Sequence, residues 1–168
     1  MRGFLICCGL VVVLTAGAVP AQAPDPLLHK PTPEFVRTDL EDHPIDLADY
    51  RGKVVLLTFW ATWCAPCRIE MPHFIRWQNQ YGPQGLQIIG VSMDDDAAPV
   101  AAFTRKHRVN YPILIGDAPL AELYGGVLGL PVTFLIDRNG NIAARYKGET
   151  GLGAMERKIQ SLLRAPGQ

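Results

Sequence analysis

The chain has 168 residues, of which 48% are hydrophobic and 19% charged, so we expect a globular fold with a substantial core and exclude a disordered chain. Its 16 basic and 16 acidic side chains balance, and nothing in their distribution indicates nucleic acid or an anionic membrane surface as a partner.

Residues 1–23 have the pattern of a secretory signal peptide. Arg2 supplies the positive start, an apolar stretch follows over residues 4–14, and small residues lead to Ala23. The apolar stretch is shorter than the about 20 residues that a membrane span needs. Cleavage is expected between residues 18 and 23, and an uncleaved leader that anchors the domain in the membrane stays open. We therefore expect an exported protein, periplasmic or otherwise extracytoplasmic.

The chain after the leader is divided by its prolines. Residues 24–33 carry four of them and are predicted to form an extended tether, which leaves residues 34–168 as one folded domain. The elements expected in the first half of that domain are a β-hairpin over 35–40 and 45–47, a buried strand over 54–60, a helix over 68–81, a buried strand over 86–92 and a helix over 100–107. Three aspartates at 94–96 are interpreted as capping this last helix rather than binding a metal.

The second half of the domain continues the alternation of strands and helices. Its expected elements are an extended piece over 111–115, a helical turn over 120–124, a hairpin over 132–136 and 142–146, and an amphipathic helix over 152–163. Asn139-Gly140 is a strong signal for the hairpin turn. This order predicts an α/β sandwich around a mixed central sheet.

The most informative motif is Trp63-Cys64-Ala65-Pro66-Cys67, at the point where the strand over 54–60 gives way to a helical pattern. Pro66 in the first helical turn places Cys64 at the helix N-terminus, where free backbone N–H groups and the helix dipole favour a thiolate. The other two cysteines, at 7 and 8, lie in the leader. One close pair in an exported domain predicts a redox-active dithiol rather than a disulfide scaffold.

Two other uses of the cysteines fit less well. A zinc site needs about four ligands, and the nearest histidine, His73, is expected on a helix surface, so no metal is predicted. A cysteine–histidine hydrolase would leave Cys67 without a function.

Two segments resemble the TlpA/ResA-like thiol–disulfide oxidoreductases of the thioredoxin superfamily. They are residues 47–67, which end in the cysteine pair, and residues 129–140, which contain Pro131. The resemblance covers about residues 34–163 and implies a thioredoxin fold: a mixed central sheet flanked by helices, with an N-terminal β-hairpin. Residues 86–112 resemble the extra strand and helix that this subfamily inserts.

The resemblance also implies roles for three catalytic residues. Cys64 would be the exposed nucleophile, and Cys67 the buried resolving thiol. Glu70 occupies the position of a carboxylate near the cysteines, where it would relay a proton and tune the thiol pKa. Thioredoxins bury an aspartate at the position of Thr58, which cannot accept a proton, so Glu70 would be the buried carboxylate here.

Five further residues are implied in substrate binding. Pro131 matches the proline that forms a cis peptide bond and faces the disulfide in this superfamily. The backbone of Leu130 would pair with an extended substrate peptide. Trp63, Ala65 and Pro66 would complete the docking surface around the nucleophile.

The implied activity is the reduction of disulfides in envelope proteins, with apocytochrome c among the candidate substrates and a membrane electron donor of the DsbD/CcdA type. No cofactor beyond the Cys64–Cys67 disulfide, no nucleic acid and a monomer are expected. A peroxiredoxin-like thiol peroxidase is the alternative enzyme, because it shares the fold and the style of residues 90–94. A non-catalytic, redox-linked assembly factor is the alternative without turnover.

Overall fold

The structure is a computed structural model that describes residues 25–148 and 151–165, so the predicted leader lies outside the described residues. The strands of its central sheet are β3 (Val54–Trp60), β4 (Leu86–Ser92), β5 (Ile113–Ile115), β6 (Val132–Ile136) and β7 (Ile142–Lys147). The helices are α1 (Ala65–Tyr81), α2 (Ala97–His107), α3 (Ala118–Leu123) and α4 (Leu152–Arg164), with 3₁₀ turns η1 (Leu47–Tyr50) and η2 (Gly82–Gln84).

The central sheet is mixed, as predicted, with the strand order β5-β4-β3-β6-β7. Strands β3, β4 and β5 run parallel, whereas β6 and β7 pair antiparallel. Strand β4 belonged to the segment expected as an insertion, yet it lies beside β3 inside the sheet, and the edge position is taken by β5. Helix α1 begins at Ala65, as the position of Pro66 predicted, and so extends three residues before the apolar spacing that starts at 68.

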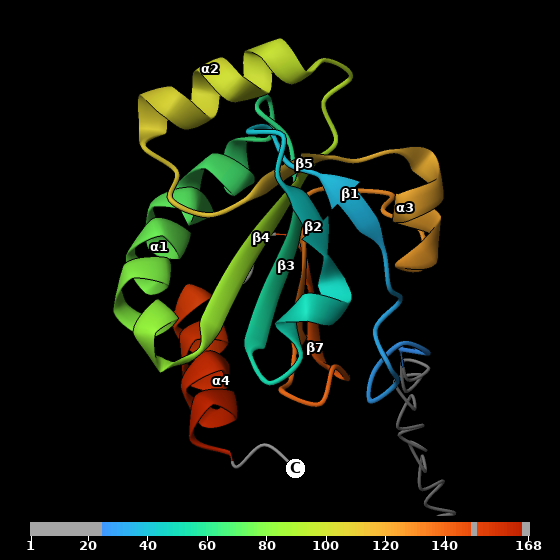
Figure 1. Ribbon diagram of the computed structural model, residues 1–168, viewed down its shortest axis with the longest axis vertical. Helices are drawn as coiled ribbons and strands as arrows, with labels where there is room; N and C mark the ends of the chain where they lie inside the picture. The colour runs from blue at the N-terminus through green and yellow to red at the C-terminus, as the bar shows by residue number, and fades with distance from the viewer. Residues whose placement is uncertain (1–24, 149–150, 166–168) are drawn as a thin grey trace, which may run out of the picture.

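Both faces of β3 are buried, which is why its sequence is continuously apolar rather than alternating. Val54 and Leu56 point toward α1 and α4, on the left of Figure 1. Val55 and Leu57 point toward α3 and the N-terminal hairpin, on the right. The sheet therefore packs through two apolar clusters against one layer on each face, α1 with α4 on one face and α3 with the hairpin on the other. The end of β3 that carries the cysteine motif lies between these two layers.

The N-terminal hairpin forms as predicted from β1 (Val36–Thr38) and β2 (Pro44–Asp46), which pair antiparallel. It is joined to the open edge of the central sheet, where the Leu40 N–H donates to the Ile113 carbonyl at 3.0 Å. The hairpin thus covers the β5 edge, which would otherwise expose unpaired backbone groups.

The described part of the expected tether, residues 25–33, contacts the domain. The His29 N–H donates to the Ile142 carbonyl at 2.8 Å, and the Ile142 N–H donates to the Lys30 carbonyl at 2.9 Å. Asp25 also forms an ion pair with the buried guanidinium of Arg145 at 3.2 Å. The division into leader, tether and domain stays a prediction, but within the described residues the segment 25–33 is bonded to the domain that was expected to start at 34.

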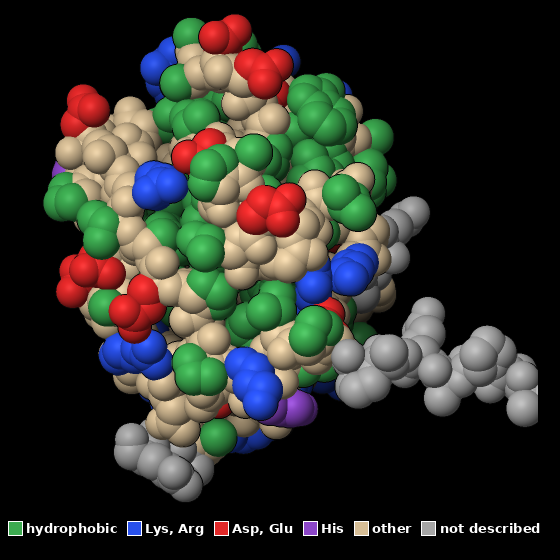
Figure 2. Space-filling view, turned by 90° about the vertical axis from the view of Figure 1, so that its right-hand side faces the viewer, with side chains coloured by type: hydrophobic (Ala, Val, Ile, Leu, Met, Phe, Trp, Pro, Cys, Tyr) green, Lys and Arg blue, Asp and Glu red, His purple; other side chains and the backbone are tan. Residues whose placement is uncertain are grey.

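The molecular surface is mixed in character. Figure 2 shows the side of the molecule that lies on the right of Figure 1, where hydrophobic and charged side chains are interspersed and the hydrophobic ones gather toward the upper right. Among residues 25–148 and 151–165, no helix combines the length and hydrophobicity needed to cross a membrane.

Candidate active site

The cysteine pair lies where β3 passes into α1. Cys64 is the N-cap of α1 in extended conformation, and Pro66 stands in the first turn of the helix, as predicted. Cys64 and Cys67 form a disulfide. The Cys67 N–H also donates to Cys64 Sγ at 3.3 Å, so one of the unpaired donors at the helix start points at the nucleophile's sulfur. After reduction, this donor and the helix dipole would stabilise a Cys64 thiolate.

The prediction that Cys64 is exposed is wrong for the disulfide form, because only 5% of the residue is accessible. Its side chain turns from the N-cap position into the first helical turn to reach Cys67, and that geometry withdraws it from the surface. Cys67 is 3% exposed, which confirms its predicted burial. The neighbouring Trp63 is 69% exposed and is the largest solvent-facing group beside the pair.

The residues implied in substrate binding lie on two neighbouring segments. The Leu130–Pro131 peptide bond is cis, which confirms that prediction. Pro131 leads into β6, whose Val132 pairs with Phe59 at the end of β3, so the proline and the cysteine motif stand at the same end of the sheet. Ala65 is exposed and Leu130 is half-buried. Their contacts with a substrate stay a prediction.

A small cavity lies directly behind the resolving cysteine. Its volume is about 10 Å³, which is close to the smallest space that holds one water molecule. The side chains that line it are Thr58, Trp60, Cys67, Glu70, Met71, Phe74 and Tyr111. Glu70 is only 4% exposed, so the structure buries this carboxyl beside Cys67 as expected, while its role in proton transfer stays a prediction.

Thr58, at the position where thioredoxins carry an aspartate, has a structural partner. Its hydroxyl is 2.9 Å from the hydroxyl of Thr133 on β6, and both residues are buried. This hydrogen bond joins two neighbouring strands and leaves Glu70 as the acidic group of the cavity.

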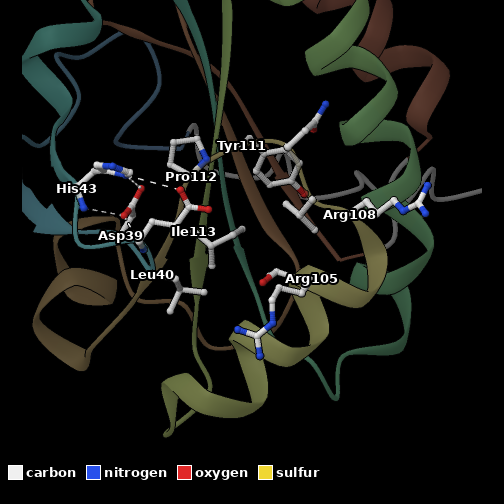
Figure 3. A pocket seen from close by; sticks show the side chains of 12 residues that line it. Asp39, Leu40, His43, Arg105, Arg108, Tyr111, Pro112 and Ile113 are labelled. Atoms are coloured by element: carbon white, nitrogen blue, oxygen red, sulfur yellow. Dashed lines mark hydrogen bonds and ion pairs between the residues drawn. The ribbon is translucent and has the colours of Figure 1, made fainter.

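Tyr111 lines both this cavity and a surface groove. No sequence motif indicated a role for this residue. The groove has a volume of about 390 Å³ and lies between the N-terminal hairpin and the end of α2. Figure 3 shows the Tyr111 ring beside Pro112 among the groove residues, with Asp39 and Arg105 also lining the groove. Burial raises the pKa of Tyr111, and the nearby charge of Glu70 raises it further, so the phenol stays protonated at neutral pH.

The interpretation that all three aspartates at 94–96 cap the following helix is wrong for Asp94. The N-cap of α2 is Asp96, whose side chain makes no capping hydrogen bond, and Asp94 does not cap the helix at all. Its carboxylate instead accepts from the Thr62 backbone N–H at 2.9 Å and from the Thr62 hydroxyl at 2.6 Å. Asp94 therefore contacts the segment that carries the cysteine motif, 32 residues earlier in the chain. No local pattern could have indicated this contact.

Comparison with known proteins places this geometry among thiol–disulfide oxidoreductases. A family model described as the AhpC/TSA family matches residues 28–145. The thiol-disulfide oxidoreductase ResA of Geobacillus kaustophilus is 36% identical over 160 residues, which cover 95% of this chain and 87% of that protein. ResA of Bacillus thuringiensis subsp. konkukian is 35% identical over 133 residues, which cover 79% of this chain and 77% of the relative.

Solved structures agree with the sequence relatives. A Chlorobium tepidum structure described as a thiol:disulfide interchange protein DsbE has a TM-score of 0.75 at 30% identity and covers 81% of this chain and 97% of its own. Another from Chlorobium tepidum TLS, a thiol:disulfide interchange protein of the thioredoxin family, has a TM-score of 0.74 at 25% identity and covers 84% of this chain and 99% of its own.

Proposed function

This chain belongs to the ResA-like thiol–disulfide oxidoreductases of the thioredoxin superfamily, and from that premise we propose that it reduces disulfides of exported proteins through a Cys64–Cys67 dithiol. The observation that carries the proposal is the disulfide at the N-terminus of α1, with the cis Pro131 at the same end of the sheet. The redox-active pair itself would hold the electrons, so the proposal includes no separate cofactor.

The reaction would run in two exchanges. The Cys64 thiolate attacks one sulfur of the substrate disulfide, forms a mixed disulfide and displaces the other substrate sulfur as a thiolate, which takes up a proton. The Cys67 thiolate then attacks Cys64 Sγ, forms the Cys64–Cys67 disulfide and releases the second substrate thiolate, which is also protonated. The substrate gains two electrons and two protons, and the enzyme loses them.

The surroundings of the pair favour a reductant over an oxidant. Ala65 and Pro66, the two residues between the cysteines, supply no histidine or basic side chain that would hold a thiolate. An ionised Glu70 beside Cys67 would further oppose a second negative charge on the thiols. A conventional thiol gives up electrons more readily, so we expect a reduction potential nearer the roughly −270 mV of thioredoxin than the roughly −120 mV of DsbA.

Glu70 would accept the proton of Cys67 when that thiol attacks the mixed disulfide. The carboxyl lines the same water-sized cavity as Cys67, so one water molecule could connect the two groups. Glu70→Gln keeps the shape of the side chain and removes the proton acceptor. We expect the release of substrate to slow by about a hundredfold and its pH dependence to lose one inflection. The matched control is Glu122→Gln, an exposed glutamate on α3, which should react like the unmodified protein.

The substrates and the electron donor follow from the family rather than from the site. Disulfide-bonded envelope proteins are the proposed substrate class, and the haem-attachment cysteines of apocytochrome c belong to it. A reductant in an oxidising compartment must be recharged, and a membrane dithiol donor of the DsbD/CcdA type would do so. We place the protein outside the cytoplasm, either released by cleavage or held by an uncleaved leader.

Two measurements test the proposed function. Equilibration of the Cys64–Cys67 pair against dithiothreitol and glutathione buffers should give a potential below about −220 mV, and a value above about −150 mV would make the protein an oxidase or isomerase. Cys67→Ser should accumulate a mixed disulfide with substrate, whereas Cys64→Ser should form none. Function of the protein that survives Cys64→Ser would support a non-catalytic assembly factor, because such a factor needs no disulfide exchange at Cys64. Consumption of peroxide with thiol reductant would support the peroxidase alternative.

A further inference from the structure

The segment that presents the nucleophile is a four-residue turn with an external anchor. The Cys64 N–H donates to the Ala61 carbonyl at 3.2 Å, which closes a β-turn with Thr62 and Trp63 at its centre. Thr62 donates two hydrogen bonds to Asp94, one from the backbone and one from the hydroxyl, at 2.9 and 2.6 Å. The first central residue of the turn is therefore held at both its main chain and its side chain.

Asp94 is itself fixed in place. The Ser92 hydroxyl donates to the same carboxylate at 2.7 Å, and Ser92 is fully buried at the end of β4. The next residue, Met93, donates its N–H to the Trp60 carbonyl at 2.8 Å, so the chain leaving β4 is tied to the chain leaving β3. Three donors on one carboxylate give short, charge-assisted bonds with little freedom of orientation.

This anchor matters for Trp63 because the indole has little packing of its own. The residue is 69% exposed, so burial in the core does not determine where the ring stands. Its position depends on the backbone of the turn, which Asp94 holds through Thr62. An exposed aromatic group that is already positioned loses less conformational freedom when a partner binds it.

We propose that Asp94 is a positioning residue for protein substrates, which fixes the Thr62–Trp63 turn so that Trp63 is preorganised beside Cys64 as a docking surface for an extended polypeptide. The inference rests on the proposed function, because it assumes that the substrates are proteins. The inference predicts different effects on two kinds of disulfide substrate. A protein disulfide brings flanking chain that can lie against Trp63, whereas a small disulfide needs only the sulfur of Cys64.

The chain offers a matched control for the charge of Asp94. Asp96 is an aspartate two residues later, it is exposed, and its side chain makes no capping bond. Asp94→Ala and Asp96→Ala each remove one negative charge near the start of α2, but only Asp94→Ala releases the turn. Thr62→Val gives an intermediate perturbation, because it removes the hydroxyl donor and keeps the backbone donor.

The experiment uses the pre-reduced protein in single turnovers against insulin and against glutathione disulfide, with tryptophan fluorescence as the signal. Insulin is varied so that the half-saturating concentration and the limiting rate are separated. For Asp94→Ala we expect the second-order rate constant on insulin to fall about three- to tenfold, mainly through weaker binding. The rate on glutathione disulfide and the reduction potential should stay unchanged. Thr62→Val should show a smaller loss on insulin, and Asp96→Ala none.

Each other outcome has a definite meaning. Equal losses on insulin and glutathione disulfide would show that Asp94 acts on the thiols themselves and would overturn the proposal, as would an Asp94→Ala variant that matches Asp96→Ala on insulin. If circular dichroism shows that Asp94→Ala does not fold, Thr62→Val takes its place, and the test is whether its rate on insulin falls relative to its rate on glutathione disulfide. Failure of the unmodified protein to reduce insulin would instead refute the proposed function.

Discussion

Reduction of the Cys64–Cys67 disulfide should lower the free energy of unfolding of this domain. The two cysteines are three residues apart, so the bond closes a very short loop. In the chain-entropy description, a loop of this length restricts the unfolded chain by about 2 kcal/mol. The disulfide form should be more stable than the dithiol form by up to that amount.

One feature of the site opposes this difference. In the reduced protein, Cys64 Sγ lies at the N-cap of α1, where the Cys67 N–H and the helix dipole stabilise a thiolate. A charge at a helix terminus is typically worth about 0.3–1 kcal/mol. The net expectation is a disulfide form more stable by about 1–2 kcal/mol. This corresponds to a potential roughly 20–40 mV below that of the same pair in the unfolded chain.

Urea unfolding of the oxidised and the reduced protein measures this difference, with fluorescence of the buried Trp60 and Trp77 as the probe. The double variant Cys64→Ser/Cys67→Ser is the control, because its stability should not respond to reductant. A reduced form as stable as the disulfide form, or more stable, would refute the reasoning. It would mean that the fold stabilises the thiolate as strong oxidants do, and that electrons flow in the opposite direction.

Two further predictions concern buried polar groups. Burial raises the pKa values of Tyr111 and Tyr124 above the ordinary 10.0, so the unfolded chain loses these protons first. The free energy of unfolding of the oxidised protein should therefore be retained below pH 10 and fall above it, by up to about 1.4 kcal/mol per pH unit for each tyrosine. Urea unfolding across this pH range measures the fall, which should be shallower for Tyr124→Phe. Asp25→Ala should lower the free energy of unfolding by about 2 kcal/mol, because it leaves the buried Arg145 guanidinium without its ion pair. The control is Glu34→Ala, which breaks the exposed ion pair with Arg51 and should lower the free energy of unfolding by less than about 1 kcal/mol in the same assay.

Local sequence determined most of the secondary structure of this protein. The apolar runs at 54–60 and 86–92 became β3 and β4 with the predicted bounds, because strands buried on both faces need unbroken apolar sequence. Asn139-Gly140 likewise marked the β6–β7 hairpin, since Gly140 adopts the positive φ that such a turn requires. The spacing of Cys64 and Cys67 indicated a redox pair, because a two-residue separation at a helix start lets the sulfurs meet.

Tertiary structure alone decided how the site is held. The burial of Cys64, the cavity between Glu70 and Tyr111, and the bonds from Thr62 to Asp94 all join residues or surfaces whose meeting depends on how β3, β4 and α1 pack. The three aspartates at 94–96 illustrate the difference. Their sequence is typical of a helix start, and a helix does start there, but the ends of two parallel strands bring Asp94 to the cysteine turn instead. A contact across 32 residues leaves no periodic trace in the chain, because it depends on strand pairing rather than on local backbone preference.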